Sequence, residues 1–386
     1  MRGIGTNLNL TPKLRFPEFR DGRGWATKRL GQLCKIRTGK KDANEGAESG
    51  PYPFFTCAEN HIYSQSYSFD AEAILVAGNA NVGQTKYFQG KFEAYQRTYV
   101  LTDFSDIHVP YLYTTLNAHL RPSLLQQVQT SAMSYIKLPM LEEYELAAPT
   151  VLGEQQKIAE CLGTLDELIG AESQKLEALK AHKKGLMQQL FPRAGETLPR
   201  LRFPEFEGAE EWSFSSLGSL CKIRTGKKDA NEGTENGLYP FFTCAENHIY
   251  SNSYSFDAEA ILIAGNANVG QAKYYNGKFE AYQRTYVLTD FADIHVPYLY
   301  ALLSANLRPA LLTQVQVSAM SYIRLPMLEE FQIGVPASSG EQERIAICLS
   351  SIDDLIAAQS AKLEALKTHK RGLMQQLFPP ASEAEA

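Results

Sequence analysis

The chain has 386 residues, 44% hydrophobic and 21% charged, which is ordinary for a globular protein of two or three domains. No run of about 18 apolar residues occurs, and residues 1–16 contain no apolar secretory core, so we expect neither a membrane span nor export and take the cytoplasm as the default location. The formal net charge of −5 argues against a protein coated in positive charge, although it leaves room for local basic patches.

The chain is a tandem repeat. LRFPEF begins at Leu14 and returns at Leu201, 187 positions later, and GLMQQLFP at Gly185 returns at Gly372 with the same offset of 187. The copies align without a gap, and most aligned positions are identical. A period this long indicates a duplicated domain, because solenoid repeats run roughly 20–50 residues.

The first part of each copy, residues 14–152 and 201–339, has a mixed pattern. Aromatic and β-branched runs broken by Gly and Asn predict strands, turns and one helix. In the first copy we expect strands at residues 73–77 and 97–102, turns at 78–83 and 89–90, and a helix near 111–127. Gln96 and Arg97 lie in a strand-like run, so one of them is expected to face inward.

The second part, residues 153–191 and 340–378, predicts one long helix per copy that ends at Pro192 or Pro379. Apolar residues recur at alternating spacings of four and three, which indicates the heptad seam of a coiled coil. An ordinary amphipathic helix packed on its own domain is the alternative. The seam residues are Ile158, Leu162, Leu165, Ile169, Leu176, Leu179, Leu186 and Leu190, with Ile345, Leu349, Ile352, Ile356, Leu363, Leu366, Leu373 and Leu377 in the second copy.

Four seam positions are polar, and they suggest a register for an antiparallel helix pair. Glu172 would face Lys370 and Lys183 would face Gln359, so that no polar seam residue faces a leucine. An isolated charge in an apolar seam is costly, whereas a paired charge can fix the register. The sequence therefore predicts these two pairs.

Motifs for catalysis or metal binding are missing from the sequence. Residues 83–91 have the wrong spacing for a phosphate-binding loop, and no dinucleotide fingerprint, nucleophile elbow or HExxH motif occurs. His61 and its counterpart His248 are expected to be structural. None of the six cysteines stands in a CxxC pair, so we expect no zinc site and mostly buried, reduced thiols.

Polar loops rich in Lys, Arg, Asn, Gln and Tyr repeat instead. Lys and Arg neutralise phosphate, while Asn, Gln and Arg can form paired hydrogen bonds with base edges. The candidate DNA-binding residues are Arg37, Lys40, Lys41, Asn44, Asn79, Asn81, Gln84, Arg97 and Tyr135, with Arg224, Lys227, Lys228, Asn231, Asn266, Asn268, Gln271, Arg284 and Tyr322 in the second copy.

Among these candidates, Lys40 and Lys41 are expected to contact phosphate and Arg97 to contribute affinity. Asn79, Asn81 and Gln84 are better candidates for base reading. Ser131, Ser134 and Lys137 accompany Tyr135 in the loop SAMSYIK. For each loop, a solvated or self-bonded turn is the competing interpretation.

A comparison within the chain favours binding. The loops TGKKDANEG, CAENHIYS, GNANVGQ and SAMSYI are identical in the two copies, while substitutions fall elsewhere, for example at residues 26–29 against 213–216. Polar surface loops should diverge first if nothing binds them. A recent gene-conversion event is the alternative explanation.

The start of the first copy resembles the opening of a target-recognition domain in the DNA-specificity subunits of type I restriction–modification systems. The segments that carry this resemblance are, in chain order, KLRFPEF, Trp25, LGQL and IRTGK. GEQQKIAECLGTLDELI followed by KLEALKAHKKGLMQQLFP resembles the spacer helix of the same family. The resemblance covers essentially the whole chain, twice. The helix pattern is the specific part, because the recognition domains vary across the family.

The resemblance implies a non-catalytic chain that holds no cofactor and binds double-stranded DNA. It implies two modification subunits that use S-adenosylmethionine to methylate adenine, and restriction subunits that cleave DNA with ATP and Mg²⁺. It also implies a bipartite site whose unread spacer is set by the helices. Family members often read two different half-sites, whereas the near-identity of these two domains predicts an inverted repeat.

We therefore predict an α+β protein, a tandem duplication of a mixed α/β DNA-recognition domain plus a long helix, with the two helices forming an antiparallel coiled coil. The expected divisions are recognition domains at residues 1–152 and 193–339, a spacer helix at 153–192, and a second spacer helix with a tail at 340–386. The alternatives are a coiled-coil scaffold with two ligand-binding globular ends, and an enzyme with a divergent site in its loops.

Overall fold

The computed structural model describes residues 10–128, 135–193, 195–314 and 322–379. The chain divides into two compact units, with unit 1 formed by Met1–Ala171 and Leu363–Ala386 and unit 2 by Glu172–Lys362. Each long helix therefore contributes one segment to each unit. The two units are thus not two consecutive stretches of the chain.

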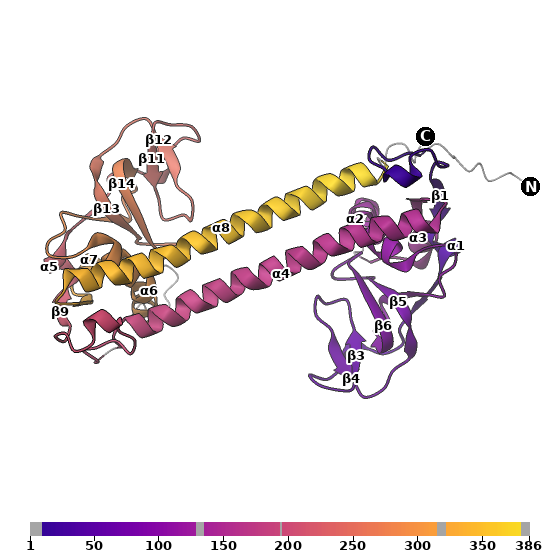
Figure 1. Cartoon of the computed structure of the whole chain (residues 1–386), viewed down its shortest axis with the longest axis horizontal. Coiled ribbons are helices and arrows are strands. Elements are labelled where there is room, and N and C mark those ends of the chain that lie inside the picture. Colours follow the sequence, from indigo (N-terminus) through magenta and orange to yellow (C-terminus); the bar gives the residue numbers. More distant parts are fainter. Residues whose placement is uncertain (1–9, 129–134, 194, 315–321, 380–386) are drawn as a thin grey trace, which may run out of the picture. The chain divides into compact units, whose positions relative to one another are not determined.

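The two copies contain the same elements in the same order (Figure 1). The first copy comprises β1(Ala26–Arg29), α1(Leu30–Leu33), β2(Lys35–Thr38), β3(Tyr52–Phe55), β4(Ile62–Ser64), β5(Phe69–Ala77), β6(Thr85–Ala94), β7(Thr98–Thr102), α2(Val109–Val128), α3(Leu138–Glu142), β8(Glu145–Ala148) and α4(Leu152–Leu190). The second comprises β9(Ser213–Ser216), α5(Leu217–Leu220), β10(Lys222–Thr225), β11(Tyr239–Phe242), β12(Ile249–Ser251), β13(Phe256–Ala264), β14(Ala272–Ala281), β15(Thr285–Thr289), α6(Val296–Gln314), α7(Leu325–Glu329), β16(Gln332–Val335) and α8(Ser339–Leu377).

A mainly antiparallel sheet forms the centre of each recognition domain. Among the described residues of unit 1 its strand order is β2-β7-β5-β6-β3-β4, and the pair β3 and β6 is parallel. Alternate residues of the central strands point to opposite faces, so Ile74 and Leu101 join the main core while Leu75 and Val100 join a smaller cluster with Phe55. Burial on both faces explains why residues 73–77 of β5 form a continuous apolar run.

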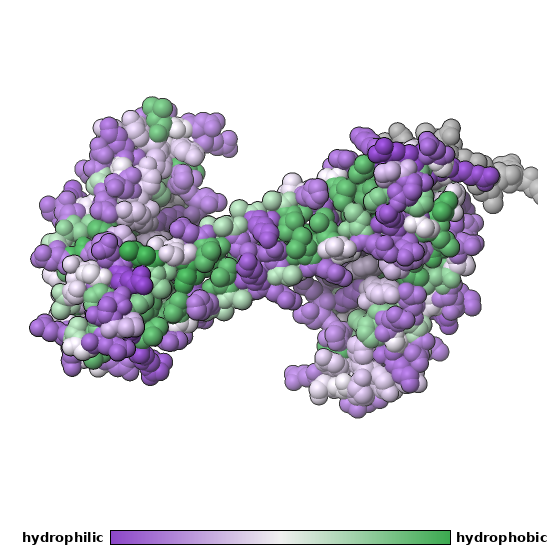
Figure 2. All heavy atoms as spheres, in the orientation of Figure 1, coloured by the Kyte–Doolittle hydropathy of each residue, from purple (hydrophilic) through white to green (hydrophobic). Residues whose placement is uncertain are grey.

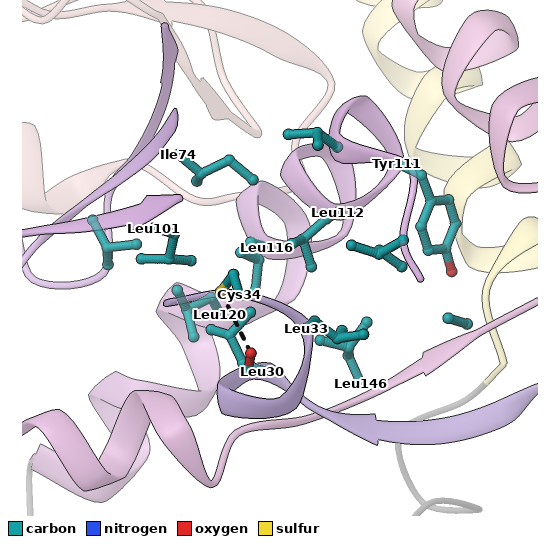
Figure 3. Close-up of a cluster of buried hydrophobic side chains, with 14 of the residues drawn as sticks. Leu30, Leu33, Cys34, Ile74, Leu101, Tyr111, Leu112, Leu116, Leu120 and Leu146 are labelled. Carbon is teal, nitrogen blue, oxygen red and sulfur yellow. Dashed lines mark hydrogen bonds between the residues drawn. The ribbon is translucent and has the colours of Figure 1, made fainter. Parts of the chain in front are cut away.

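The main core of unit 1 lies between this sheet, α2 and the ends of the long helices (Figure 3). Phe378, just after the end of α8, packs edge-on against Trp25 with ring centroids 6.1 Å apart. In unit 2, Phe191 after the end of α4 lies 5.9 Å from Tyr298. The end of each copy's helix thus completes the core of the other copy's domain.

A buried ion pair anchors the start of α4 to the segment before the first strand. The Nε and Nη2 atoms of Arg15 donate to the two carboxylate oxygens of Glu154 at 2.6 and 2.7 Å, and the indole nitrogen of Trp25 donates to the same carboxylate at 3.2 Å. Arg202, Glu341 and Trp212 repeat the arrangement in unit 2. The arginine of LRFPEF and the glutamate of GEQ therefore make the same contact in both units.

The long helices pair in antiparallel fashion within each unit, as expected. In unit 1 the start of α4, at Ile158 and Leu162, shares a core cluster with Leu377 at the end of α8. In unit 2 Leu190, at the end of α4, shares a cluster with Ile345 near the start of α8. The coiled-coil prediction is confirmed in its orientation.

The predicted register is wrong. Glu172 accepts a hydrogen bond from Gln359 at 2.6 Å, the equivalent residue of the other copy, rather than pairing with Lys370, which lies about three helical turns further along. Lys183 pairs with Asp353 and Lys370 with Asp166, each at 2.5 Å. The physical reason is that a lysine stem can extend past the seam and place its ammonium group on a flanking carboxylate, so polar seam residues need not face one another.

Replacing Glu172 with Gln should lower the stability of the protein at neutral pH but not at acidic pH. Hydrogen bonds from Gln359 and Lys362 lower the pKa of Glu172. A carboxylate with a lowered folded-state pKa stabilises the protein above its unfolded pKa of about 4.3, and this contribution disappears as the pH falls through the folded-state value. The Glu172→Gln variant should therefore unfold at a lower temperature than the parent at pH 7, with the gap closing as the pH is lowered from 7 to below about 4.3. A gap that stays constant over this range would contradict the assignment.

Two local expectations are also wrong. Gln96 and Arg97 form a turn between β6 and β7, and both are exposed, because Thr98 donates its backbone N–H to the Tyr95 carbonyl at 2.8 Å and closes the turn. Residues 89–90 lie within β6 rather than in a turn. The helix expected near 111–127 is α2.

The described cysteines are all free thiols, four of them buried, as the sequence predicts. Of the helices in the described part of the chain, none is long and apolar enough to cross a membrane.

Candidate nucleic-acid interface

The polar loops of each recognition domain converge on the turn that carries Arg97. The Arg97 carbonyl accepts hydrogen bonds from the backbone N–H of Gly78 at 2.9 Å and from the Cys57 thiol at 3.3 Å. The Gln96 N–H donates to the Lys41 carbonyl at 2.9 Å, and the Ile136 N–H donates to the Gly78 carbonyl at 2.8 Å. Loops that are far apart in the sequence therefore form one surface.

Close backbone approach explains two of the repeated glycines. A Cβ atom on Gly39 would lie 1.8 Å from the Ala94 carbonyl oxygen, and one on Gly78 would lie 2.4 Å from the Arg97 oxygen. Only glycine fits at either position. Part of the identity between the copies is therefore a packing requirement, which accounts for these glycines without any bound partner.

The loop of residues 78–84 also stores backbone strain. Ala80 has a φ of 51°, and its counterpart Ala267 has a φ of 52°. A non-glycine residue in the left-handed region costs about 1–2 kcal/mol, and such residues concentrate at functional sites. Retention of this conformation in both copies supports a functional role for the loop.

Arg97 is an exposed candidate on a fixed backbone. Its backbone is fixed by the converging loops, whereas its guanidinium group is exposed and makes no hydrogen bond or ion pair within the described residues. Lys40 is likewise exposed, and Asn79 half-buried, without a side-chain partner in the same ranges. The second-copy residues with the same exposure are Lys227, Asn266 and Arg284.

Lys41, in contrast, is committed to internal partners. Its ammonium group donates to the hydroxyls of Ser64 at 2.9 Å and Ser66 at 2.7 Å, and lies 3.5 Å from the buried carboxylate of Glu93. Lys228 has the equivalent partners Ser251, Ser253 and Glu280. These contacts favour a structural role over the phosphate contact predicted from the sequence.

Arg37 is held less firmly. Its guanidinium group lies 3.1 Å from Asp103, and Arg224 lies 2.8 Å from Asp290 in the second copy. Both pairs are exposed, and exposed ion pairs contribute only about 0–1 kcal/mol. A DNA phosphate could therefore replace the Asp103 carboxylate at little energetic cost, so Arg37 remains a candidate DNA-binding residue.

Asn44 has an exposed side chain at the end of the loop of residues 38–46, while its backbone N–H donates to Asp42 at 3.3 Å. Gln96 also donates to Asp42, at 3.0 Å, which ties this loop to the Arg97 turn. Asn231 and Gln283 repeat the pattern around Asp229. Asn44 therefore remains free to contact a ligand from a fixed loop.

The candidate base readers differ from one another. Asn81 uses its amide nitrogen to donate to the Cys57 carbonyl at 3.0 Å, as Asn268 does to Cys244 at 2.9 Å. The side-chain oxygen of Gln84 is buried and has no partner in the described part of the chain. Its counterpart Gln271 is half-buried. Asn81 thus holds a neighbouring loop, whereas the equally half-buried Asn79 has no side-chain partner within the described residues.

The tyrosine candidates lie just after segments outside the described residues. Tyr322 is 55% exposed and Tyr135 is half-buried, and each precedes an isoleucine whose N–H anchors the segment to Gly78 or Gly265. The candidates Ser131 and Ser134 lie outside the described residues. Lys137 occupies the N-terminal cap position of α3 without a capping side-chain hydrogen bond.

Lys86 is a residue of this region that the sequence did not reveal. Its ammonium group donates to the Ala58 carbonyl at 2.7 Å and lies 5.8 Å from the centroid of the Phe55 ring. Partial burial lowers the pKa of Lys86. Its position within β6 gave no signal, because a lysine in a half-exposed strand ordinarily points to solvent. No group of His, Cys, Asp and Glu side chains suited to a metal ion occurs among the residues that the structure describes.

The fold and the gathered loops define a class of protein, one with a duplicated recognition domain and an exposed basic and amide surface on each copy. The chain belongs to the type I restriction modification DNA specificity domain family, whose model matches residues 22–181 and 209–368. Membership confirms the expectation of a DNA-specificity subunit rather than an enzyme, and it disfavours a general scaffold.

Two curated relatives are specificity subunits of type I restriction enzymes. The chain is 39% identical over 156 residues to the EcoDI subunit of Escherichia coli, a match that covers 40% of this chain and only 34% of that protein. It is 26% identical over 406 residues to the MjaVIII subunit of Methanocaldococcus jannaschii, covering 95% and 93% of the two chains.

A solved S subunit from M. genitalium has the same fold. It matches with a TM-score of 0.72 at 16% sequence identity and covers 96% of this chain and all of the other. The duplicated α/β domains with long helices, predicted from the sequence, are thereby confirmed.

Proposed function

We propose that the chain reads a bipartite DNA site, with one recognition domain on each half-site, and directs adenine methylation or DNA cleavage by partner subunits. The observation that carries the proposal is the exposed guanidinium group of Arg97, and of Arg284, on a backbone turn fixed by three neighbouring segments. Arginine on a rigid support suits paired hydrogen bonds to guanine, the commonest specific contact in the major groove.

The two half-sites have the same base sequence on opposite strands. Two domains with identical loops should recognise identical bases. Antiparallel helices in general relate two equal halves by a two-fold axis, which is also the symmetry of duplex DNA. An inverted repeat around a fixed spacer follows from these two arguments.

The partners are double-stranded DNA, two modification subunits and the restriction subunits, and the complex works in the cytoplasm. S-adenosylmethionine, ATP and Mg²⁺ act on the partner subunits rather than on this chain. Exposed leucines on the long helices support subunit docking, because Leu168 and its counterpart Leu355 remain 41% and 56% exposed. Figure 2 shows hydrophobic colour along these helices, while most of the visible recognition-domain surface is hydrophilic.

Lys40→Ala tests the DNA-binding surface. Because Lys40 is exposed and has no side-chain partner among the described residues, its loss should weaken binding to all duplex sequences alike and lower the slope of log K against log salt by about one unit. The measurement is a salt titration of DNA binding by the chain assembled with its modification subunits.

Lys180→Ala is the matched control, since Lys180 is an exposed helix lysine paired with Glu177 and should leave the slope unchanged. Parent binding that did not depend on salt would contradict the proposed function, whereas an unchanged slope for Lys40→Ala alone would remove only this contact.

A further inference from the structure

Residues 57–61, in the repeated segment CAENHIYS, form a loop that two distant side chains hold in place. Asn81 donates to the Cys57 carbonyl at 3.0 Å, and Lys86 donates to the next carbonyl, that of Ala58, at 2.7 Å. The Cys57 thiol donates to the Arg97 carbonyl at 3.3 Å, so the loop lies directly beside the Arg97 turn. The contacts of the second copy are 2.9, 2.7 and 3.3 Å.

The far end of the loop is fixed as well. The ring of His61 packs against Phe55 with centroids 5.5 Å apart and against Tyr63 at 5.2 Å. Between the two anchored ends lie Glu59 and Asn60, both exposed. The Asn60 amide makes no hydrogen bond within the described ranges of the chain. The loop therefore presents one unengaged amide at a well-defined position.

The use of Lys86 to hold the loop carries an energetic cost. Partial burial disfavours the charged form of Lys86, and its ammonium group is directed to a loop carbonyl rather than to a ligand. Lys273 makes the same contact in the second copy. We expect this arrangement to place the loop tip precisely, because a base-reading side chain must be held within a fraction of an ångström.

We propose that Asn60 and its counterpart Asn247 each read a base in one half-site, with Lys86 and Lys273 as positioning residues. The inference rests on the proposed function. An asparagine amide offers one donor and one acceptor, the pair that matches the N6 and N7 atoms of adenine. The neighbouring Glu59 carboxylate repels phosphate, so the tip is suited to a base edge in the groove rather than to the DNA backbone.

This assignment also resolves the position of Asn81. The sequence identifies Asn81 as a base reader, but its amide nitrogen is engaged with the Cys57 carbonyl. Asn81 instead acts through the loop that carries Asn60. The loop of residues 57–61 then supplies the amide, and Arg97 beside it supplies the guanidinium group.

The test measures base preference at each position of the site, using the chain assembled with its modification subunits and duplexes that carry every single substitution. Asn60→Ala should reduce discrimination at one A·T pair of one half-site by about tenfold or more. Asn247→Ala should do the same at the equivalent pair of the other half-site, so each variant serves as the control for the other.

Lys86→Met tests the positioning role separately. It should reduce discrimination at the same pair as Asn60→Ala and leave the other positions unchanged, which a general loss of folding would not do. Lys86→Arg should restore part of the preference. If the parent selects a bipartite site and Asn60→Ala shows the parent's preference at every position, the inference is wrong while the proposed function stands. If the parent selects no site, the proposed function itself fails.

Discussion

Replacing Arg97 and Arg284 together with alanine should abolish sequence-specific DNA binding under conditions where the parent binds tightly. Each arginine presents an exposed guanidinium group, without a partner in the described part of the chain, on a fixed turn, and a lost paired contact to guanine costs about 1–3 kcal/mol. The two residues belong to different compact units, so their effects should add to about 2–6 kcal/mol. Equilibrium binding to the cognate duplex measures this loss.

Non-specific binding provides the internal control for these variants. The phosphate contacts of other residues remain, so affinity for unrelated duplexes should fall only slightly. Each single variant should lose about half of the total effect. A double variant that kept the parent's ratio of specific to non-specific affinity would show that the Arg97 turn does not read bases.

Glu154→Ala should destabilise unit 1 by about 3–5 kcal/mol. Arg15 is only 7% exposed, and removing the carboxylate would leave its guanidinium group buried without a counter-charge. Breaking one partner of a buried ion pair carries a cost of this size. The Trp25 indole nitrogen would lose its acceptor as well.

The two tryptophans allow each unit to be followed separately, because Trp25 lies in unit 1 and Trp212 in unit 2. In a Trp212→Phe background, Trp25 fluorescence during denaturant unfolding reports unit 1 alone. Glu145→Ala is the matched control, since Glu145 and Arg29 form a pair with side chains 45% and 58% exposed that should contribute less than about 1 kcal/mol. Equal losses for the two variants would contradict a stabilising role for the buried pair.

The sequence predicts the long helices well because their stabilising pattern is local. Seam residues recur along one face, and the observed α4 and α8 begin within a residue of the expected positions. The register was not predictable from the seam alone. It depends on flanking residues such as Asp166 and Asp353, which lie off the seam and accept the ammonium groups of Lys370 and Lys183.

The candidate DNA-binding site could likewise be predicted only in part from the sequence. The sequence identified the repeated loops as separate candidates, and it could show neither that they converge nor which of their side chains are engaged with internal partners. Lys40 and Lys41 are neighbours in the chain, yet only Lys41 meets Ser64, Ser66 and Glu93, which lie far from it in the sequence. The turn at Gln96 and Arg97 contains no Gly, Pro, Asn or Asp, so it lacks the residues by which a turn is ordinarily identified.

Sequencing of modified adenines tests the central claim most directly. The chain is co-expressed with the modification subunit encoded beside it, in cells whose DNA is otherwise unmodified. We expect methylation at two copies of one short word, on opposite strands, around a spacer of constant length. Two unrelated half-sites would contradict the equivalence of the two recognition domains, and no modified site from an active complex would contradict the assignment of DNA recognition to this chain.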